Sequence, residues 1–339
     1  VITMTHEIQK RMEQKINNGA LVMGAVLVGG LVEIGRVVSE RRQATVTGVK
    51  SYYEDDGPSF IFLRGCGENH QAQAPLFHDK LGGYGSMHFE YQTQGRHSQE
   101  AIDQNIIDAC KADGDRDRVL VCTSMGLMNG MRSLMNPRVR DAIGEQRLQA
   151  IVSRSGITSK VDLQPSMQRA AEVSSHTPSL PIIGDVWRLH RLRRAYGAIP
   201  HSKYTTDEEA RLHYESSAAM PFPLVASQHQ AIHQSTPWSQ GSHLHIAHEN
   251  PQLRLYQITA ERDDVANWQS TNKSLEGSFG IPVETIVDER RPSGHADDLE
   301  FVEPLEELMM KLSGRHRSVA AAARNLVMYS GGGSHALAS

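Results

Sequence analysis

VLVCTSMG, at residues 119–126, is the stretch of the chain that decides the fold. A short apolar run at 119–122 is followed by Ser124, which has small or compact neighbours. This pattern indicates a buried strand followed by a sharp turn, with the serine in the turn and a helix starting directly after it. Such a turn leaves little room two positions before and two positions after the serine, which Gly126 meets fully and Cys122 only approximately. The stretch predicts a nucleophilic serine at an elbow, with an ordinary strand-to-helix turn as the alternative.

Strand and helix patterns alternate on both sides of this stretch. Runs rich in β-branched, aromatic or other apolar residues predict strands at 44–53, 59–63, 87–91, 117–122, 148–152, 253–259 and 283–287. Helical spacing predicts helices at 98–110, with Ser98 as the cap, at 125–134 and at 303–312. This alternation favours an α/β fold, in which a mostly parallel central sheet carries helices on both faces.

The region between residues 153 and 249 differs in composition from the rest of the chain. It is rich in Pro, His, Ser and Arg and contains only short helical patterns. We interpret residues from about 156 to 250 as a helical lid inserted over the sheet edge, within one domain at 43–312. Residues 313–339 include the run SGGGS and are expected to form a flexible C-terminal tail.

An uncharged, almost wholly apolar run lies near the N-terminus, at residues 16–32. As a helix it would reach about 25 Å, the lower limit for a bilayer core. We therefore expect residues 1–42 to hold an apolar helix that serves as a membrane anchor at 16–35. Basic residues flank both sides, so the charges do not decide the orientation; we expect an extracytoplasmic catalytic domain, with a cytoplasmic one as the alternative. A buried soluble helix and a cleaved secretory segment are the alternatives.

Composition excludes several classes of function. Hydrophobic residues make up 39% of the chain and charged residues 22%, as in an ordinary folded protein. The net charge of −4 gives no sign of a nucleic-acid partner. Three cysteines without a C-x-x-C pair do not form a disulfide framework. His229 and His233 have helical i, i+4 spacing but no H-E-x-x-H pattern, so we expect no metal site.

A serine that transfers acyl groups needs a base, and the base needs an orienting acid. In an elbow-type enzyme the chain order is serine, acid and histidine, with the last two on loops after late strands. The strand at 253–259 runs into Asp263 and Asp264, and the strand at 283–287 runs toward Gly294 and His295. We predict that Ser124 is the nucleophile, His295 the general base and Asp263 the orienting carboxylate, with Asp264 as the alternative acid.

Over about residues 45–312 the chain resembles the α/β-hydrolase superfamily. The resemblance is carried by the sequence LRGCG at 63–67, the elbow at 122–126, Asp263 and the Gly-His pair at 294–295. It implies an oxyanion hole made of two backbone N–H groups, those of Cys66 and Met125. Three positions depart from the family pattern: Arg64 replaces a histidine, Cys122 replaces the first elbow glycine and Leu127 replaces a second glycine that often packs against the sheet.

The resemblance implies a serine hydrolase with an acyl-enzyme intermediate. The expected reaction is cleavage of a carboxylester or thioester, with amide cleavage behind them, and no cofactor is required. The expected partner is a small ester-type molecule, with a lipid among the candidates. The departures from the motif support one alternative, a catalytically silent hydrolase-like domain that binds a ligand or a partner.

Overall fold

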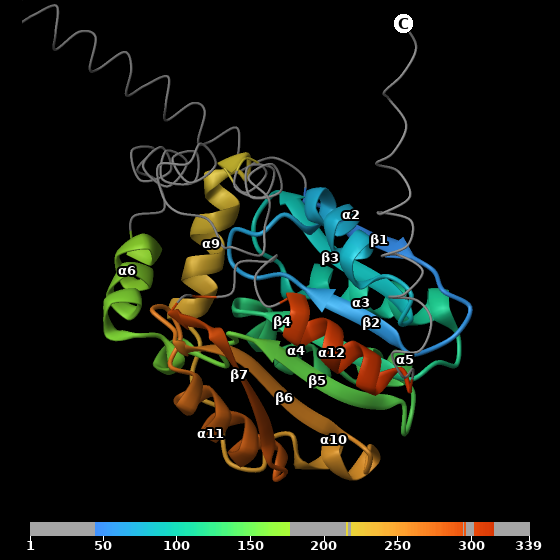
Figure 1. Cartoon of the computed structure of the whole chain (residues 1–339). Coiled ribbons are helices and arrows are strands. Elements are labelled where there is room, and N and C mark those ends of the chain that lie inside the picture. The colour runs from blue at the N-terminus through green and yellow to red at the C-terminus, as the bar shows by residue number, and fades with distance from the viewer. Residues whose placement is uncertain (1–44, 177–214, 216–217, 294, 296–301, 315–339) are drawn as a thin grey trace, which may run out of the picture.

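The computed structural model describes residues 45–176, 215, 218–293, 295 and 302–314 of the chain. Within these residues one sheet contains seven strands in the order β1-β3-β2-β4-β5-β6-β7 (Figure 1). The strands are β1 (Val46–Tyr52), β2 (Ser59–Leu63), β3 (Ser86–Gln94), β4 (Arg118–Thr123), β5 (Leu148–Arg154), β6 (Arg254–Arg262) and β7 (Val283–Ser293). Strand β1 pairs with β3 in the antiparallel sense, and the other neighbours are parallel. The prediction of a mostly parallel sheet is therefore confirmed.

Helices connect most of these strands. They are α2 (His70–Leu81), α3 (Gln99–Asp113), α4 (Met125–Leu134), α5 (Pro137–Ile143), α6 (Pro165–His176), α9 (Phe222–His233), α10 (Leu244–Glu249), α11 (Trp268–Phe279) and α12 (Val302–Leu312), with a short 3-10 turn, η1 (Lys160–Asp162). Helix α3 begins as expected, because the Ser98 hydroxyl accepts a hydrogen bond from the Ala101 N–H at 3.2 Å.

Alternating side chains divide the core between the two faces of the sheet. In β4, Val119 and Val121 join a cluster that includes residues of α2 and α12. Leu120 and Cys122 join the opposite cluster, which includes residues of α3, α4, α5 and α11. In Figure 1, α12 lies on the viewer's side of the sheet. Both faces are thus covered by helices, as the run of apolar residues in the central strands requires.

Helix α2 was not predicted from the sequence. Its buried side includes His70 and Gln73 beside Ala74, Phe77 and Leu81, and Pro75 lies inside it. Polar residues on the inner face remove the apolar periodicity by which a helix is recognised. The helix is held by its neighbours in the fold, since the His70 Nδ1 lies 3.0 Å from the backbone oxygen of Glu90 on β3.

The segment expected to form a lid divides in two where the structure describes it. Helices α6 and α9 pack against each other beyond one end of the sheet (Figure 1). Helix α10 instead belongs to the body, because Ile246 joins the core and Asn250 Oδ1 accepts the Leu148 N–H at 2.9 Å. We therefore restrict the term lid helices to α6 and α9, whose role as a lid stays a prediction.

Two expectations concern residues outside the described part. The N-terminal segment, with its expected membrane anchor at 16–35, precedes residue 45, and most of the expected tail follows residue 314. Both stay predictions. A search of the described residues finds no helix with the length and apolar character needed to cross a bilayer.

Candidate active site

Ser124 forms a strained elbow between β4 and α4. Its backbone has φ 49° and ψ −116°, a region that residues other than glycine rarely adopt. Such a conformation costs about 1–3 kcal/mol and persists only where neighbours fix it. Two backbone hydrogen bonds do so: the Ser124 N–H donates to the Arg154 oxygen at 2.9 Å, and the Ile157 N–H donates to the Ser124 oxygen at 3.1 Å. The predicted elbow is therefore present, with its serine 9% exposed.

Gly126 brings the first turn of α4 against the end of β2. A Cβ atom at Gly126 would lie 2.3 Å from the backbone oxygen of Leu63 and 3.0 Å from that of Arg64. The first distance is shorter than real Cβ contacts and involves a backbone atom, so only glycine fits here without a shift of the backbone. The loop that follows β2 therefore starts directly beside the elbow, which is where the sequence predicts the oxyanion hole.

Two departures from the family motif are accommodated by glycines elsewhere. Cys122 fits because Gly130, one turn along α4, has no side chain; a Cβ there would lie 3.2 Å from the Cys122 sulfur. Leu127 fits because Gly156 follows β5; a Cβ there would lie 2.7 Å from Leu127 Cδ2 and 2.9 Å from its Cβ. The strand–helix packing of the elbow is thus kept with the small residues in different positions.

The third departure, Arg64, is a buried and paired side chain. Its Nε lies 3.3 Å from Glu90 Oε2, and its Nη2 donates to Gln92 Oε1 at 3.2 Å. Both partners are on β3, and Arg64 and Glu90 are almost fully buried. A buried arginine needs such an acidic partner. The Arg64 side chain is therefore part of the packed interior, although its backbone begins the loop after β2.

The structure brings together Ser124, His295 and Asp263. The His295 Nε2 lies 2.9 Å from the Ser124 Oγ, and the His295 Nδ1 lies 3.0 Å from each carboxylate oxygen of Asp263. These distances are within hydrogen-bond reach for a nucleophile, a base and an acid that orients the base. The His295 side chain is 18% exposed, so solvent reaches the edge of this group.

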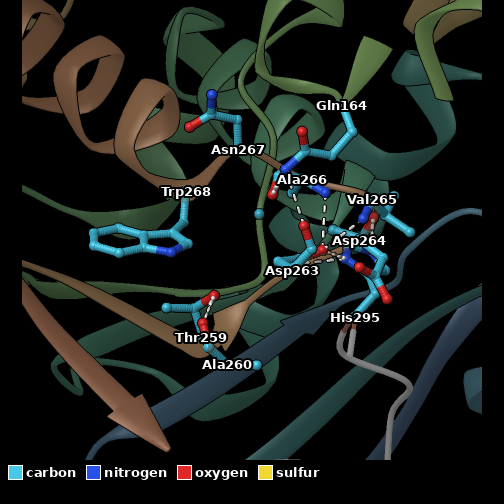
Figure 2. A network of polar contacts seen from close by, with 12 residues as sticks. Gln164, Thr259, Ala260, Asp263, Asp264, Val265, Ala266, Asn267, Trp268 and His295 are labelled. Atoms are coloured by element: carbon cyan, nitrogen blue, oxygen red, sulfur yellow. Dashed lines mark hydrogen bonds and ion pairs between the residues drawn. The ribbon is translucent and has the colours of Figure 1, made fainter. Parts of the chain in front are cut away.

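Asp263 lies at the centre of a tight turn after β6 (Figure 2). Its Oδ1 accepts the N–H groups of Val265 and Ala266, each at 2.8 Å, and Gln164 Nε2 donates to its backbone oxygen at 3.0 Å. Burial raises the pKa of Asp263, but the contact with His295 and the two backbone N–H groups outweigh it and leave the pKa below its ordinary value. The carboxyl group is therefore held in its charged form.

Asp264, the alternative acid, points elsewhere. Its side chain is 63% exposed, and its Oδ1 lies 3.6 Å from the Nε of Arg262, which is also exposed. Such surface pairs contribute little stability. The contact with His295 is made by Asp263.

The two residues expected to form the oxyanion hole lie on either side of the elbow. Met125 is the first residue of α4, where a backbone N–H has no partner within the helix and the helix dipole is positive. Cys66 lies in the loop after β2, and its side chain packs against the cluster that contains Met125 and Met128. The oxyanion role of both N–H groups remains a prediction.

Hydrogen bonds hold the loop around Cys66. The Gly65 N–H donates to the Glu68 carboxylate, and the Gly67 N–H donates to Gln228 Oε1 at 3.0 Å. Gln228 lies on α9 and is fully buried. Sequence reasoning missed this residue, because a single glutamine on a short helix gives no local signal of a contact with a distant loop.

A second Ser-His-Asp group lies at the edge of the sheet, away from the elbow. The His88 Nδ1 lies 2.9 Å from the Ser51 Oγ, and its Nε2 lies 2.7 Å from Asp113 Oδ2. Ser51 is inside the extended strand β1, without a strained backbone and without a helix start behind it. This second group has the same three types of side chain as Ser124, His295 and Asp263. Ser51, however, has neither the strained backbone of Ser124 nor a helix that starts directly after it.

Other binding chemistry is sparse in the part of the chain that the structure describes. There, no group of three or more His, Cys, Asp or Glu side chains is arranged to hold a metal ion. Cys122 is buried, and its burial raises the pKa of the thiol, which keeps it protonated and unreactive.

Solved structures of several hydrolases share this fold. A carboxylesterase from Nitrososphaera gargenis has a TM-score of 0.54 at 10% identity and covers 80% of this chain and 96% of its own. The esterase EaEST from Exiguobacterium antarcticum has a TM-score of 0.54 at 12% identity and covers 81% and 98%. A hydrolase from Pseudomonas aeruginosa has a TM-score of 0.53 at 12% identity and covers 81% and 97%. No protein-family model matches the sequence, and no curated protein does. At such identities these likenesses establish the fold.

Proposed function

We propose that this chain, which has the α/β-hydrolase fold, is a serine hydrolase that cleaves a carboxylester or a thioester through an acyl-enzyme intermediate. Amide bonds are the slower alternative substrates. The observation that carries the proposal is the run of contacts from Ser124 to His295 to Asp263, with Ser124 on a strained elbow at the carboxyl end of β4. Each member supplies one chemical role that acyl transfer requires.

His295 is the proton carrier in the proposed reaction. Ionised Asp263 accepts the Nδ1–H and so leaves the lone pair of Nε2 directed at the Ser124 hydroxyl. As Oγ attacks the substrate carbonyl, its proton moves to Nε2, and the carbonyl oxygen becomes negative. The same proton then passes to the leaving alcohol or thiol. Water repeats the sequence on the acyl-enzyme and releases the acid.

The developing negative charge needs fixed donors. In the proposal these are the backbone N–H groups of Cys66 and Met125, the second at the positive end of α4. Removing one such donor from an acyl-transfer enzyme typically costs about 3 kcal/mol of barrier. Because both are backbone groups, the unusual side chains of this chain at those positions do not weaken them.

Apolar side chains from the lid helices and the elbow favour a substrate with an apolar acyl group. Met125 and Met128 of α4 cluster with Ile232 of α9, and Met167 of α6 packs against them. Cys66 also packs against a second cluster, which contains Met220 and Leu224. Methionine side chains are flexible and adapt to irregular apolar groups. We therefore propose a small ester-type substrate, with the lid helices α6 and α9 over its acyl part.

Reaction with a fluorophosphonate tests the proposal. An activated serine displaces fluoride from phosphorus and keeps the phosphonyl group, whereas an unactivated serine does not react. We expect stoichiometric labelling of the full chain, located by peptide mass spectrometry at Ser124.

Ser51 provides the matched control for that experiment. It contacts His88 through Nδ1, whereas Ser124 contacts His295 through Nε2, and it has no elbow. The Ser51→Ala variant should label as fast as the unmodified chain. A chain that stays unlabelled would instead support the silent hydrolase-like domain, and an adduct on Ser51 would show that the elbow is not what activates the serine.

The pH dependence should follow a single group. The pKa of Asp263 is held below its ordinary value, so this carboxylate remains charged throughout the range in which histidines titrate. Its stabilising effect is present above its ordinary pKa and is lost only as the pH falls through the lowered one. Ester hydrolysis measured as kcat/KM should rise with pH with a slope of about one on a logarithmic plot, as protonated His295 loses its proton. A slope near two would contradict the assignment.

A further inference from the structure

We infer that Gln228 is a positioning residue for the oxyanion hole: through its amide oxygen, helix α9 fixes the loop at 65–67 and so controls the chemical step. The role rests on the proposed function, because the Cys66 N–H is an oxyanion donor only if Ser124 attacks a carbonyl. It adds to that function a link between a lid helix and catalysis.

The backbone of the loop is intrinsically flexible. Cys66 stands between two glycines, and Gly67 has a φ of +76°, a conformation that glycine enters and leaves freely. A useful oxyanion donor must already point at the developing charge before the reaction begins. A Gly-Cys-Gly segment therefore needs contacts from outside to hold its N–H groups in one direction.

Gln228 provides such a contact at the neighbouring peptide. The Gly67 N–H donates to its Oε1 at 3.0 Å, and the Cys66 thiol lies 3.5 Å from the same oxygen. Because the Gly67 N–H belongs to the peptide plane that follows Cys66, holding it restricts the ψ angle of Cys66. The Cys66 N–H belongs to the preceding peptide, which lies between this contact and the Gly65 N–H that donates to Glu68, so movement of that peptide is limited at both ends.

The amide oxygen of Gln228 makes the side-chain contacts of this residue with the loop. Gln228 is fully buried, and its Nε2 has no hydrogen-bond partner among the described residues. Its oxygen, in contrast, is fully used by the loop.

Other residues attach α9 to the body of the fold. Ser227 Oγ accepts the His97 N–H at 2.8 Å, and Gln230 Oε1 accepts Arg96 Nη2 at 3.2 Å. Both contacts are with the loop after β3 and not with the oxyanion loop. Gln230 therefore provides a control on the same helix, with the same side chain and a different partner.

The test compares Gln228→Met with Gln230→Met in the full chain. Methionine keeps the length of the side chain and removes the acceptor oxygen. For Gln228→Met we expect kcat for a short ester to fall about 10- to 100-fold, less than the loss of a whole oxyanion donor, while KM changes little. Binding of a trifluoromethyl ketone, which forms an oxyanion on Ser124, should weaken by the same factor. Gln230→Met should leave kcat and KM near their original values.

Amide hydrogen exchange supplies a readout that needs no activity. Exchange in the segment 64–69 should become faster in Gln228→Met and stay unchanged in Gln230→Met. If the methionine variant does not fold, Gln228→Asn keeps the amide but shortens its reach, and the same loss of kcat is expected.

Several results would overturn the role of Gln228. An unchanged kcat with faster exchange would show that the contact orders the loop without serving catalysis. A rise in KM alone would place Gln228 against the substrate instead. If the unmodified chain neither reacts with the fluorophosphonate nor hydrolyses esters, the proposed function and the role of Gln228 are both refuted. This result is distinct from the others because it is seen without any substitution.

Discussion

The Asp263→Asn variant is expected to hydrolyse a short carboxylester with a kcat about 10⁴-fold below that of the unmodified chain. The amide oxygen still accepts the N–H groups of Val265 and Ala266, so the turn around it stays folded. The amide nitrogen, however, can donate to His295 Nδ1 and so shift the proton of the ring to Nε2. Nε2 then presents an N–H to Ser124 and cannot accept its proton. Steady-state kinetics and a melting curve measure the two effects separately.

Asp264→Asn is the control for that loss. Its carboxylate is exposed and lies near Arg262, so we expect a kcat within about twofold of the original, as for surface changes of little structural effect. The opposite order of the two variants would assign the acid role to Asp264. It would also show that the turn after β6 differs in solution from the one in Figure 2.

Gly126→Ala is expected to have the largest effect on stability. The added Cβ would lie 2.3 Å from the Leu63 backbone oxygen, and a backbone atom inside a sheet cannot move aside as a side chain can. Helix α4 would have to withdraw from β2, which separates the elbow from the oxyanion loop. We expect a loss of at least about 3 kcal/mol in the free energy of unfolding, at the upper end for overpacked sites, and slower labelling at Ser124. Urea denaturation provides the measurement.

Gly277→Ala is the matched control for this change. Gly277 lies in α11, and a Cβ there would meet nothing within 4 Å. Glycine inside a helix is less favourable than alanine by about 0.5–1 kcal/mol, so this variant should be slightly more stable than the original. Equal urea midpoints for the two variants would show that the clash at Gly126 is relieved without cost.

The sequence predicted the sheet well because its strands are local features. Continuous apolar runs such as 59–63 become fully buried strands, and their alternating sides supply the two faces of the core. The prediction of Ser124, Asp263 and His295 as one group depended on a further rule, that in an elbow-type enzyme the acid and the histidine follow the serine on loops after late strands. Their catalytic roles stay predictions until labelling and kinetics test them.

Other features could not be predicted, because they depend on contacts between distant segments. Helix α2 buries polar residues on its inner face, and one of them, His70, contacts a backbone oxygen of the neighbouring strand β3. The choice between Asp263 and Asp264 depends on a turn that moves one side chain inward and the next outward. Gln228 meets its loop across 161 residues of chain, a distance over which spacing carries no information.

The glycines beside the elbow have a consequence for how such a motif varies. Cys122 and Gly130 share one space, and Leu127 and Gly156 share another. A side chain at Gly130 would also meet Leu63, and one at Gly156 would also meet Ser153, so a larger residue at either glycine requires its neighbours to change as well. A comparison that scores each position by itself penalises Cys122 and Leu127 and gives no credit to their partners. A comparison that scores neighbouring positions together would find an elbow in which the larger residues lie at 122 and 127 and the glycines at 130 and 156.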